Sequence, residues 1–223
     1  VWSSGGTVSG VTNIAARAQV INMSLGGGGA CDTTTQNAIN SARSRGTVVI
    51  VAAGNENQNA SNSNPANCSG VVTVAATTRA GGKASYSNYG TVVDVAAPGG
   101  GTGGSILSTL NRGTSSPGSD TYAGYQGTSM ATPHVAGVAA LMLAKNAALT
   151  PDQIESKLKS TARAFPATCS GCGTGIVDAA AAVASATGTT PAPGPTISET
   201  ESNNTISTAN AVSTTGTTVN GTM

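Results

Sequence analysis

Residues 127–137 read Gly-Thr-Ser-Met-Ala-Thr-Pro-His-Val-Ala-Gly. A serine, Ser129, follows a Gly-Thr turn and leads into an apolar run, which predicts a central, buried helix over residues 130–144. The first turn of a helix has unpaired N–H groups and the positive end of the helix dipole, so it favours negative charge. A hydroxyl at that place can attack a carbonyl while nearby amides hold the oxyanion that forms. The stretch therefore predicts a nucleophilic serine at the start of a helix.

Short apolar runs and helical patterns occur on both sides of this stretch. Strands are expected at residues 20–23, 48–52, 71–75 and 92–96, and further helices at residues 33–45 and 151–163. The strands show little polar alternation, which is typical of a parallel sheet covered on both faces. The alternation predicts an α/β fold, a mostly parallel sheet with helices on both faces. Its active site should lie at the carboxyl ends of the strands, where Ser24, Asn55 and Ser129 fall.

Residues 127–137 also resemble the nucleophile segment of the subtilisin-like serine peptidases, the subtilases. Segments that resemble the same family occur in family order at residues 20–27, 51–56, 83–90, 93–99 and 173–180. The resemblance implies a subtilisin-like fold that is incomplete at the N-terminus. It also implies a serine-type endopeptidase that hydrolyses peptide bonds through an acyl-enzyme on Ser129.

The resemblance carries over to particular residues. Asn55 would complete the oxyanion hole beside the catalytic Ser129. Two edges would bind the substrate backbone as an added strand, and their residues are Ser24, Leu25, Gly26, Ala52, Ala53 and Gly54. The glycine run at residues 26–29 would leave a wide pocket for large apolar side chains. Glu56 at its rim would add tolerance for Lys or Arg.

The catalytic Asp and His of the family precede the segment at Ser24, but the residues before Ser24 contain neither. The only histidine, His134, follows Ser129 by five residues, so about 140° of rotation and about 7.5 Å of rise separate them on one helix. We interpret His134 as a packed helix histidine. The catalytic Asp and His are then expected in a missing N-terminal part of the domain, and this chain alone should be inactive. The alternative is a non-catalytic subtilase-like module that binds peptides.

Four cysteines allow three pairings, and the local choice joins Cys31 to Cys68 and Cys169 to Cys172. A four-cysteine zinc site would need two close pairs. A redox pair should open a helix after a strand, whereas Cys169 and Cys172 lie in a Gly-rich loop. We expect structural disulfides, which indicate an oxidising compartment and a secreted protein.

The amino-acid composition and the sequence motifs exclude several classes of binding partner. Only 9% of the residues are charged and the net charge is +1, so neither a nucleic acid nor a membrane is an expected partner. Residues 99–104 fit G-x-G-x-x-G, but residues 105–109 read as a strand rather than as the helix that a dinucleotide site requires. The expected partner is a protein or peptide substrate. The chemistry needs no cofactor, and no metal-ligand cluster is visible. The resemblance allows structural calcium in the full-length protein, with Asp94 in a segment where the family sometimes has a weak site.

The composition changes near the C-terminus. Residues 1–186 are expected to be the C-terminal part of a catalytic domain, and residues 187–197 a Pro/Thr/Gly linker. Residues 198–223 resemble the truncated start of a bacterial pre-peptidase C-terminal β domain; a disordered Ser/Thr tail is the alternative. Val1 does not read as a natural start, so we expect a chain cut at both ends.

Overall fold

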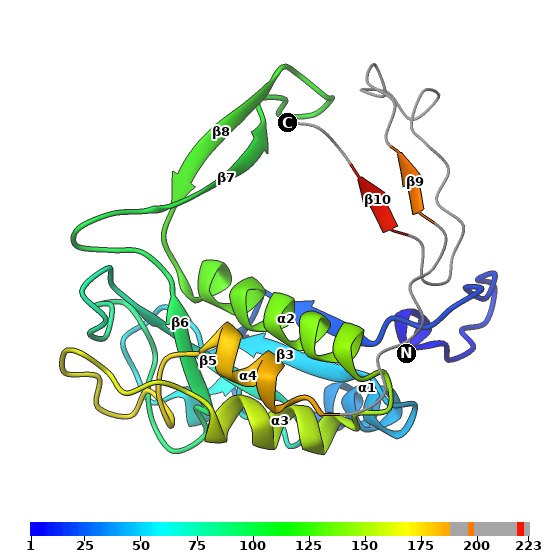
Figure 1. Cartoon of the computed structure of the whole chain (residues 1–223), viewed down its shortest axis with the longest axis horizontal. Helices are drawn as coiled ribbons and strands as arrows, with labels where there is room; N and C mark the ends of the chain where they lie inside the picture. The colour runs from blue at the N-terminus through cyan, green and yellow to red at the C-terminus, as the bar shows by residue number, and fades with distance from the viewer. Residues whose placement is uncertain (188–195, 199–217, 221–223) are drawn as a thin grey trace.

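The computed structural model describes residues 1–187, 196–198 and 218–220. Its centre is a parallel four-stranded sheet in the order β1-β3-β5-β6 (Figure 1). The strands are β1 (Val20–Met23), β3 (Val48–Ala52), β5 (Val72–Thr77) and β6 (Val95–Pro98). β6 begins later than the expected 92–96 because a turn occupies residues 91–92. The predicted parallel α/β sheet is therefore confirmed.

Successive side chains of β3 pack alternately on the two faces of the sheet. Val48 and Ile50 pack in a cluster with residues of α2 (Thr128–Lys145), α3 (Pro151–Ser160) and α4 (Ala179–Ser185). Val49 and Val51 pack against α1 (Thr33–Ser44) on the other face. All five residues of β3 are buried, which is why its sequence is continuously apolar. Helices thus cover both faces, as the sequence predicts.

α3 begins at a local capping motif, whereas its end depends on a contact with a distant segment. Thr150 and Gln153 form the capping box that the sequence indicates. The helix ends at Ser160 rather than at residue 163, because Arg163 exchanges backbone hydrogen bonds of 2.8 and 2.9 Å with Ile176. This pairing ties the C-terminal part of the domain to the edge of the sheet.

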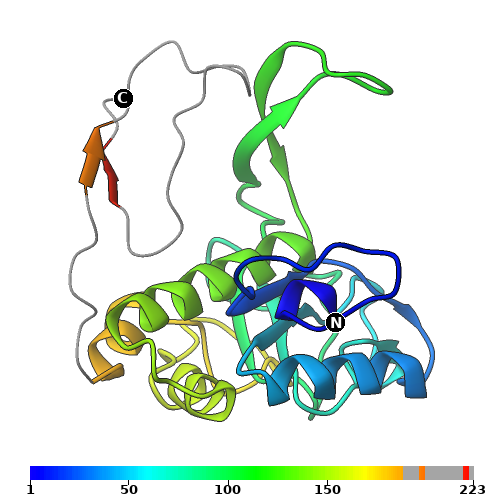
Figure 2. The same cartoon turned by 90° about the vertical axis from the view of Figure 1, so that its right-hand side faces the viewer.

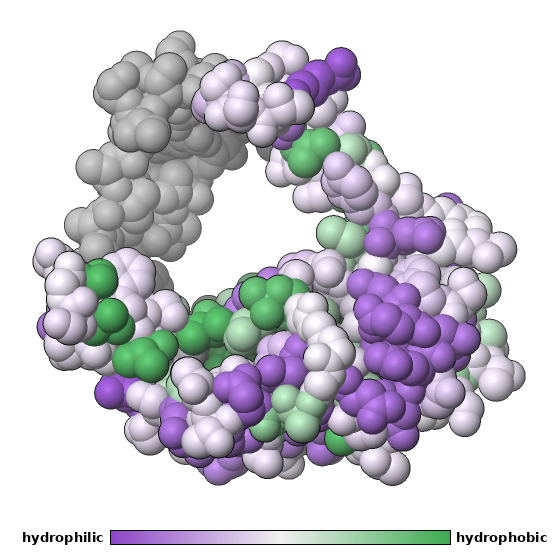
Figure 3. All heavy atoms as spheres, turned by 180° about the vertical axis from the view of Figure 1, so that it is seen from behind, coloured by the Kyte–Doolittle hydropathy of each residue, from purple (hydrophilic) through white to green (hydrophobic). Residues whose placement is uncertain are grey.

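α2 crosses the sheet, but it is not buried all round. Residues such as Val135, Ala139 and Met142 are buried against the sheet, whereas Leu141 is 55% exposed. His134 is also exposed, so its interpretation as a packed histidine is wrong. The physical reason is that the outer side of α2 is left uncovered by the described residues. The view from behind shows apolar residues reaching the surface in the middle of the body (Figure 3).

An antiparallel hairpin projects away from the sheet and its helices (Figures 1 and 2). It consists of β7 (Ile106–Asn111) and β8 (Asp120–Tyr125), so the strand expected at residues 105–109 is confirmed. Leu107 and Tyr122 are about 70% exposed on it, at 69% and 71%. The hairpin thus presents apolar side chains to solvent.

Short elements complete the description. They are η1 (Trp2–Ser4), β2 (Gly27–Gly28), η2 (Ala60–Asn62) and β4 (Ser63–Asn64), with β9 (Thr196–Ser198) and β10 (Thr218–Asn220) as a separate parallel pair. Both expected disulfides are present, Cys31–Cys68 and Cys169–Cys172. Most of the expected linker (187–197) and C-terminal segment (198–223) lies outside the described residues. Among the helices described, none has the length and apolarity to cross a bilayer.

Candidate active site

Three segments that are distant in sequence meet at the carboxyl edge of the sheet. Ser24 follows β1, Asn55 follows β3, and Ser129 lies in the first turn of α2. The Ser129 hydroxyl donates to the Ser24 carbonyl oxygen at 3.3 Å, and the Ser24 hydroxyl donates to the Ser129 carbonyl oxygen at 2.8 Å. The structure therefore brings together the three residues that the sequence places at this edge.

A proline inside α2 explains why Ser24 can bind the Ser129 carbonyl. A helical carbonyl normally accepts from the N–H four residues later, but the residue four after Ser129 is Pro133, which has no N–H. The Ser24 hydroxyl supplies the missing donor. Ser24 thus fixes the backbone of the nucleophile.

Asn55 is oriented by the residue before the nucleophile. Its Oδ1 accepts from the backbone N–H of Thr128 at 2.8 Å and from the Thr128 hydroxyl at 2.9 Å. A backbone N–H can only donate, so the bonded atom must be the oxygen of the amide. The Asn55 NH₂ is left without a hydrogen bond to the described residues, and Asn55 lines the same pocket as Ser129. The arrangement leaves an N–H donor beside the serine.

A buried asparagine shapes the loop that carries Asn55. Asn88 is fully buried, and its Nδ2 donates to the Ala53 carbonyl oxygen at 2.9 Å and to Glu56 Oε2 at 2.8 Å. Its Oδ1 accepts from the backbone N–H groups of Glu56 and Gln58, each at 3.0 Å. Gly54 has φ 104°, and a Cβ there would lie 2.3 Å from Asn88 Nδ2. The loop conformation therefore depends on both residues.

A cavity of about 260 Å³ opens beside Ser129. Its lining residues are Ser24, Leu25, Gly26, Gly27, Ala52, Gly54, Asn55, Glu56, Ser63, Asn64, Thr128 and Ser129. These include every substrate-binding residue expected from the sequence except Ala53, which is fully buried. Gly27 belongs to the glycine run that is expected to shape the pocket, and the structure adds Ser63, Asn64 and Thr128, as well as Asn88 behind the loop. Only the adjacency of Thr128 to Ser129 could have indicated one of them.

The two expected substrate edges differ. Leu25 and Gly26 make no backbone hydrogen bonds within the described residues, so their polar groups are accessible to an extended ligand. In the other segment, Ala53 donates to the Val74 carbonyl oxygen and Gly54 donates to the Thr128 hydroxyl. Residues 52–54 therefore form a wall of the pocket rather than a second free edge.

The far side of the pocket is fastened by the first disulfide. β2 and β4 pair through Gly27 and Asn64, and Cys31 and Cys68 join the segments that follow them. Asp32, next to Cys31, caps α1 and accepts from Asn64 Nδ2 at 3.1 Å. Hydrogen bonds from the Thr35 side chain and backbone lower the pKa of Asp32 to about 2. The carboxylate therefore stays ionised where it holds both α1 and β4.

No base acts on Ser129 within the described residues. The only imidazole, His134, contacts the Met130 carbonyl oxygen through Nδ1 at 2.8 Å instead of Ser129. Its place on the helix is the one expected from the five-residue spacing. Among the described residues the only side-chain or backbone partner of the serine hydroxyl is therefore the Ser24 carbonyl oxygen.

Asp94 does not fit a calcium site. Its Oδ1 accepts from Lys159 Nζ at 2.8 Å and its Oδ2 accepts from the Thr73 N–H at 2.8 Å. An ammonium thus occupies the position beside the carboxylate that a cation would need. The described residues also contain no cluster of three or more His, Cys, Asp or Glu side chains suited to a metal.

Comparisons with known proteins agree on the family. The model of the subtilase family matches residues 4–189. An extracellular protease of Xanthomonas campestris pv. campestris is 64% identical over 183 residues, which are 81% of this chain and 31% of that protein. An extracellular basic protease of Dichelobacter nodosus is 45% identical over 81% of this chain and 30% of its own length. A solved protease structure from Pseudoalteromonas arctica PAMC 21717 matches with a TM-score of 0.81 and 62% identity, covering 83% of this chain and 56% of that one. The chain thus spans about a third of these curated relatives.

Proposed function

Because this chain belongs to the subtilase family, we propose that it is the nucleophile-bearing part of a secreted serine endopeptidase. Ser129 Oγ attacks the carbonyl carbon of the substrate peptide bond and gives its proton to a histidine. That histidine and its Asp partner are proposed to lie in a preceding part of the same domain. The C–N bond then breaks, the amine leaves with the proton, and water hydrolyses the acyl-enzyme on Ser129.

The oxyanion hole consists of the Asn55 side-chain NH₂ and the Ser129 N–H. The observation that carries this assignment is the pair of hydrogen bonds from Thr128 to Asn55 Oδ1. They direct the amide oxygen away from the reaction and leave the NH₂ beside the serine. Donors held in advance at the site of developing charge are the largest single contribution in many enzymes.

The substrate binds as an extended strand along Leu25 and Gly26, with the side chain before the cleaved bond in the 260 Å³ cavity. Large apolar side chains are the preferred occupants, and Glu56 tolerates Lys or Arg at the rim. One oxygen of Glu56 is already bonded to Asn55 N–H and Asn88, so this tolerance should be modest.

Secretion is supported by the two disulfides and by the extracellular relatives. A C-terminal β domain of the pre-peptidase type beginning near residue 198, after the linker, remains part of the proposal. A structural calcium in the full-length protein is a further prediction, to which Asp94 gives no support. The alternative, a peptide-binding module without catalysis, does not explain why Asn55, with an unbonded NH₂, lines the same cavity as the serine.

Labelling of Ser129 tests the proposal. The chain is joined to the corresponding N-terminal part of the Xanthomonas relative and treated with a sulfonyl fluoride. Peptide mapping should find the label on Ser129, and Ser129→Ala should abolish both labelling and casein cleavage. A label elsewhere, or full activity of Ser129→Ala, would show that the assignment is wrong. A fusion that folds and binds peptides but is neither labelled nor active would favour the binding module.

A further inference from the structure

A second cavity, of about 360 Å³, lies at the carboxyl ends of the other two strands of the sheet. Thr77 ends β5 and Pro98 ends β6, and both line it. The cavity beside Ser129 lies instead at the carboxyl ends of β1 and β3. The two cavities therefore flank the position where α2 and its serine begin.

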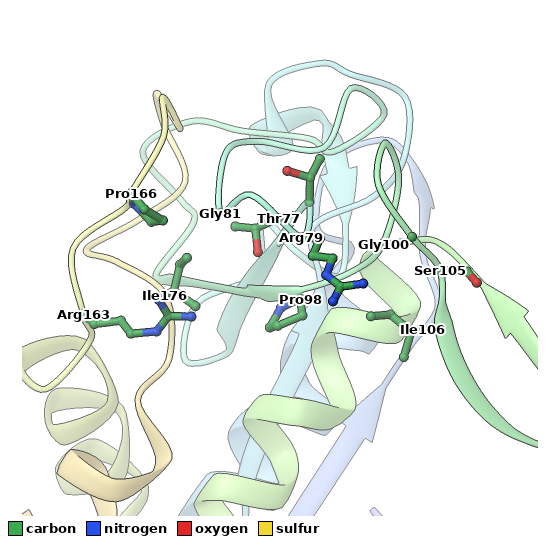
Figure 4. A pocket seen from close by; sticks show the side chains of 12 residues that line it. Thr77, Arg79, Gly81, Pro98, Gly100, Ser105, Ile106, Arg163, Pro166 and Ile176 are labelled. Atoms are coloured by element: carbon green, nitrogen blue, oxygen red, sulfur yellow. The ribbon is translucent and has the colours of Figure 1, made fainter.

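The second cavity has the chemistry of an anion site. Arg79 and Arg163 enter it from two separate loops, and Pro98 lies between their guanidinium groups (Figure 4). No acidic side chain lines the cavity. Neither guanidinium has an ion pair or a hydrogen bond to the described residues, whereas Arg43 on α1 has both kinds of partner. Ile106 and Ile176 supply an apolar surface beside the charges.

The wall of this cavity is bonded directly to the nucleophile segment. Gly127, two residues before Ser129, donates its N–H to the Gly99 carbonyl oxygen at 2.9 Å. Tyr86 fixes the same wall, because its hydroxyl lies 2.7 Å from the Gly99 carbonyl oxygen and 2.9 Å from that of Gly100. A Cβ on Gly100, which lines the cavity, would lie 3.2 Å from Gln126 Cβ. Ser129 is the third residue after Gln126, so the two Cα atoms are at most about 11 Å apart.

The path of a bound peptide follows from this layout. If the acyl side of the substrate occupies the edge at Leu25 and Gly26, the chain beyond the cleaved bond leaves Ser129 toward the ends of β5 and β6. Resting on the proposed function, we propose that the second cavity is a subsite for the leaving-group side of the substrate. It binds an acidic side chain located two to four residues after the cleaved bond. The guanidinium groups accept the carboxylate in charge-assisted hydrogen bonds, and the methylene groups pack on Ile106 and Ile176.

The expected preference is moderate because both arginines are exposed. Exposed charge pairs contribute little individually, so two of them should give about a three- to tenfold advantage in kcat/KM for Glu over Gln at the bound position. High salt should reduce the advantage, since screening acts strongly on exposed charges. An apolar contact alone would not show that dependence.

The test uses the fusion with the N-terminal part of the Xanthomonas relative and internally quenched peptides with one constant acyl side. The peptides carry Glu, Gln or Lys at the second, third or fourth position after the cleaved bond. The variants are Arg79→Gln, Arg163→Gln, both together, and Arg45→Gln as a control that removes one charge, as each single variant does. Arg45 follows α1 and precedes β3, so it lies at the amino ends of the strands, whereas both cavities lie at the carboxyl ends. Rates are divided by the concentration of active sites, which is measured by titration with sulfonyl fluoride. Misfolded enzyme therefore does not affect the values of kcat.

The ratio of kcat/KM for Glu over Gln should be three to ten in the parent and in Arg45→Gln. It should fall to about one in the double variant and in the parent at 0.5 M NaCl. A ratio of one in the parent at every position, or an unchanged ratio in the double variant, would overturn the subsite. A p-nitroanilide substrate, which has no residue after the bond, tests the proposed function separately. If the parent cleaves it and Ser129→Ala does not, the proposed protease function is supported even where the subsite proposal is refuted.

Discussion

Single polar side chains set the geometry of the site through hydrogen bonds to the backbone or side chains of distant segments. Asn88 holds the loop after β3, Thr128 holds Asn55, and Ser24 holds the Ser129 backbone. Each contact is made by a side chain whose partner is more than 20 residues away in sequence. The geometry of the site is therefore set by tertiary contacts, and each of them can be removed separately by mutation.

Replacing Asn55 by leucine removes the proposed oxyanion donor while keeping a side chain of similar size. We expect kcat of the completed protease to fall by about 10² to 10³, the magnitude for such a donor in subtilisin, a member of the same family. KM should change little, because the donor acts on the transition state. Steady-state kinetics on a p-nitroanilide substrate measure both constants. Asn37→Leu on exposed α1 is the matched control, and an equal loss there would rule out a specific role for Asn55.

Replacing Ser24 by alanine leaves the Ser129 carbonyl without a donor, since Pro133 cannot supply one. The free energy of unfolding should fall by about 0.5–1.5 kcal/mol, the net value of one hydrogen bond, and kcat should fall with it. Adding Pro133→Ala returns an N–H at the normal helical position. In urea titrations of all four proteins, the two changes together should cost less than the sum of the single changes. Strict additivity would contradict the compensation.

At the scale of elements, α1 depends on one ionised cap. The pKa of Asp32 is lowered to about 2 by hydrogen bonds from Thr35, against about 3.8 when unfolded. A lowered pKa stabilises the folded state above pH 3.8, and the contribution is lost as pH falls toward 2. The cap of α1 should therefore weaken within that window.

The corresponding variant is Asp32→Ala. It should unfold at lower urea concentration than the parent at pH 6, because the variant loses the side-chain acceptor that caps the first turn of α1. The difference between the two midpoints should shrink steadily between pH 4 and pH 2. Thr33→Ala, which removes no charge, should show a difference from the parent that does not depend on pH. A pH-independent difference for Asp32→Ala would show that the carboxylate charge is not what stabilises the helix.

The sequence predicted elements whose signals are local. The apolar run at residues 48–52 and the Thr150–Gln153 capping box are complete within a few residues, and both are present as expected. The end of α3 depends on the pairing of Arg163 with Ile176 across the loop, so no local pattern could reveal it. Asn88 in the site was missed for the same reason. Its partners lie between Ala53 and Ser63, and a single buried asparagine has no periodic signature.

At the scale of the whole molecule, apolar surface remains uncovered in two places. One is the outer side of α2, where Leu141 is 55% exposed. The other is the projecting hairpin, where Leu107 and Tyr122 are more exposed still. The projecting hairpin carries green residues in the view from behind (Figure 3). Exposed apolar residues on a central helix mark a surface that another part of the protein is expected to cover.

We therefore predict that the isolated chain is inactive and unstable. Among the described residues Ser129 has no base, so its hydroxyl is a weak nucleophile, and an intact oxyanion hole alone gives at most about 10³ to 10⁴ over the uncatalysed rate. Each Å² of apolar surface left in water forgoes about 25 cal/mol, against a net stability of about 5–15 kcal/mol for a whole domain. The isolated chain should bind a hydrophobic dye, melt without a sharp transition and leave casein uncut. The fusion that supplies the N-terminal part should lose the dye signal and gain both a cooperative melt and activity. A soluble, cooperatively melting isolated chain that cleaves casein, with activity abolished by Ser129→Ala, would refute the prediction.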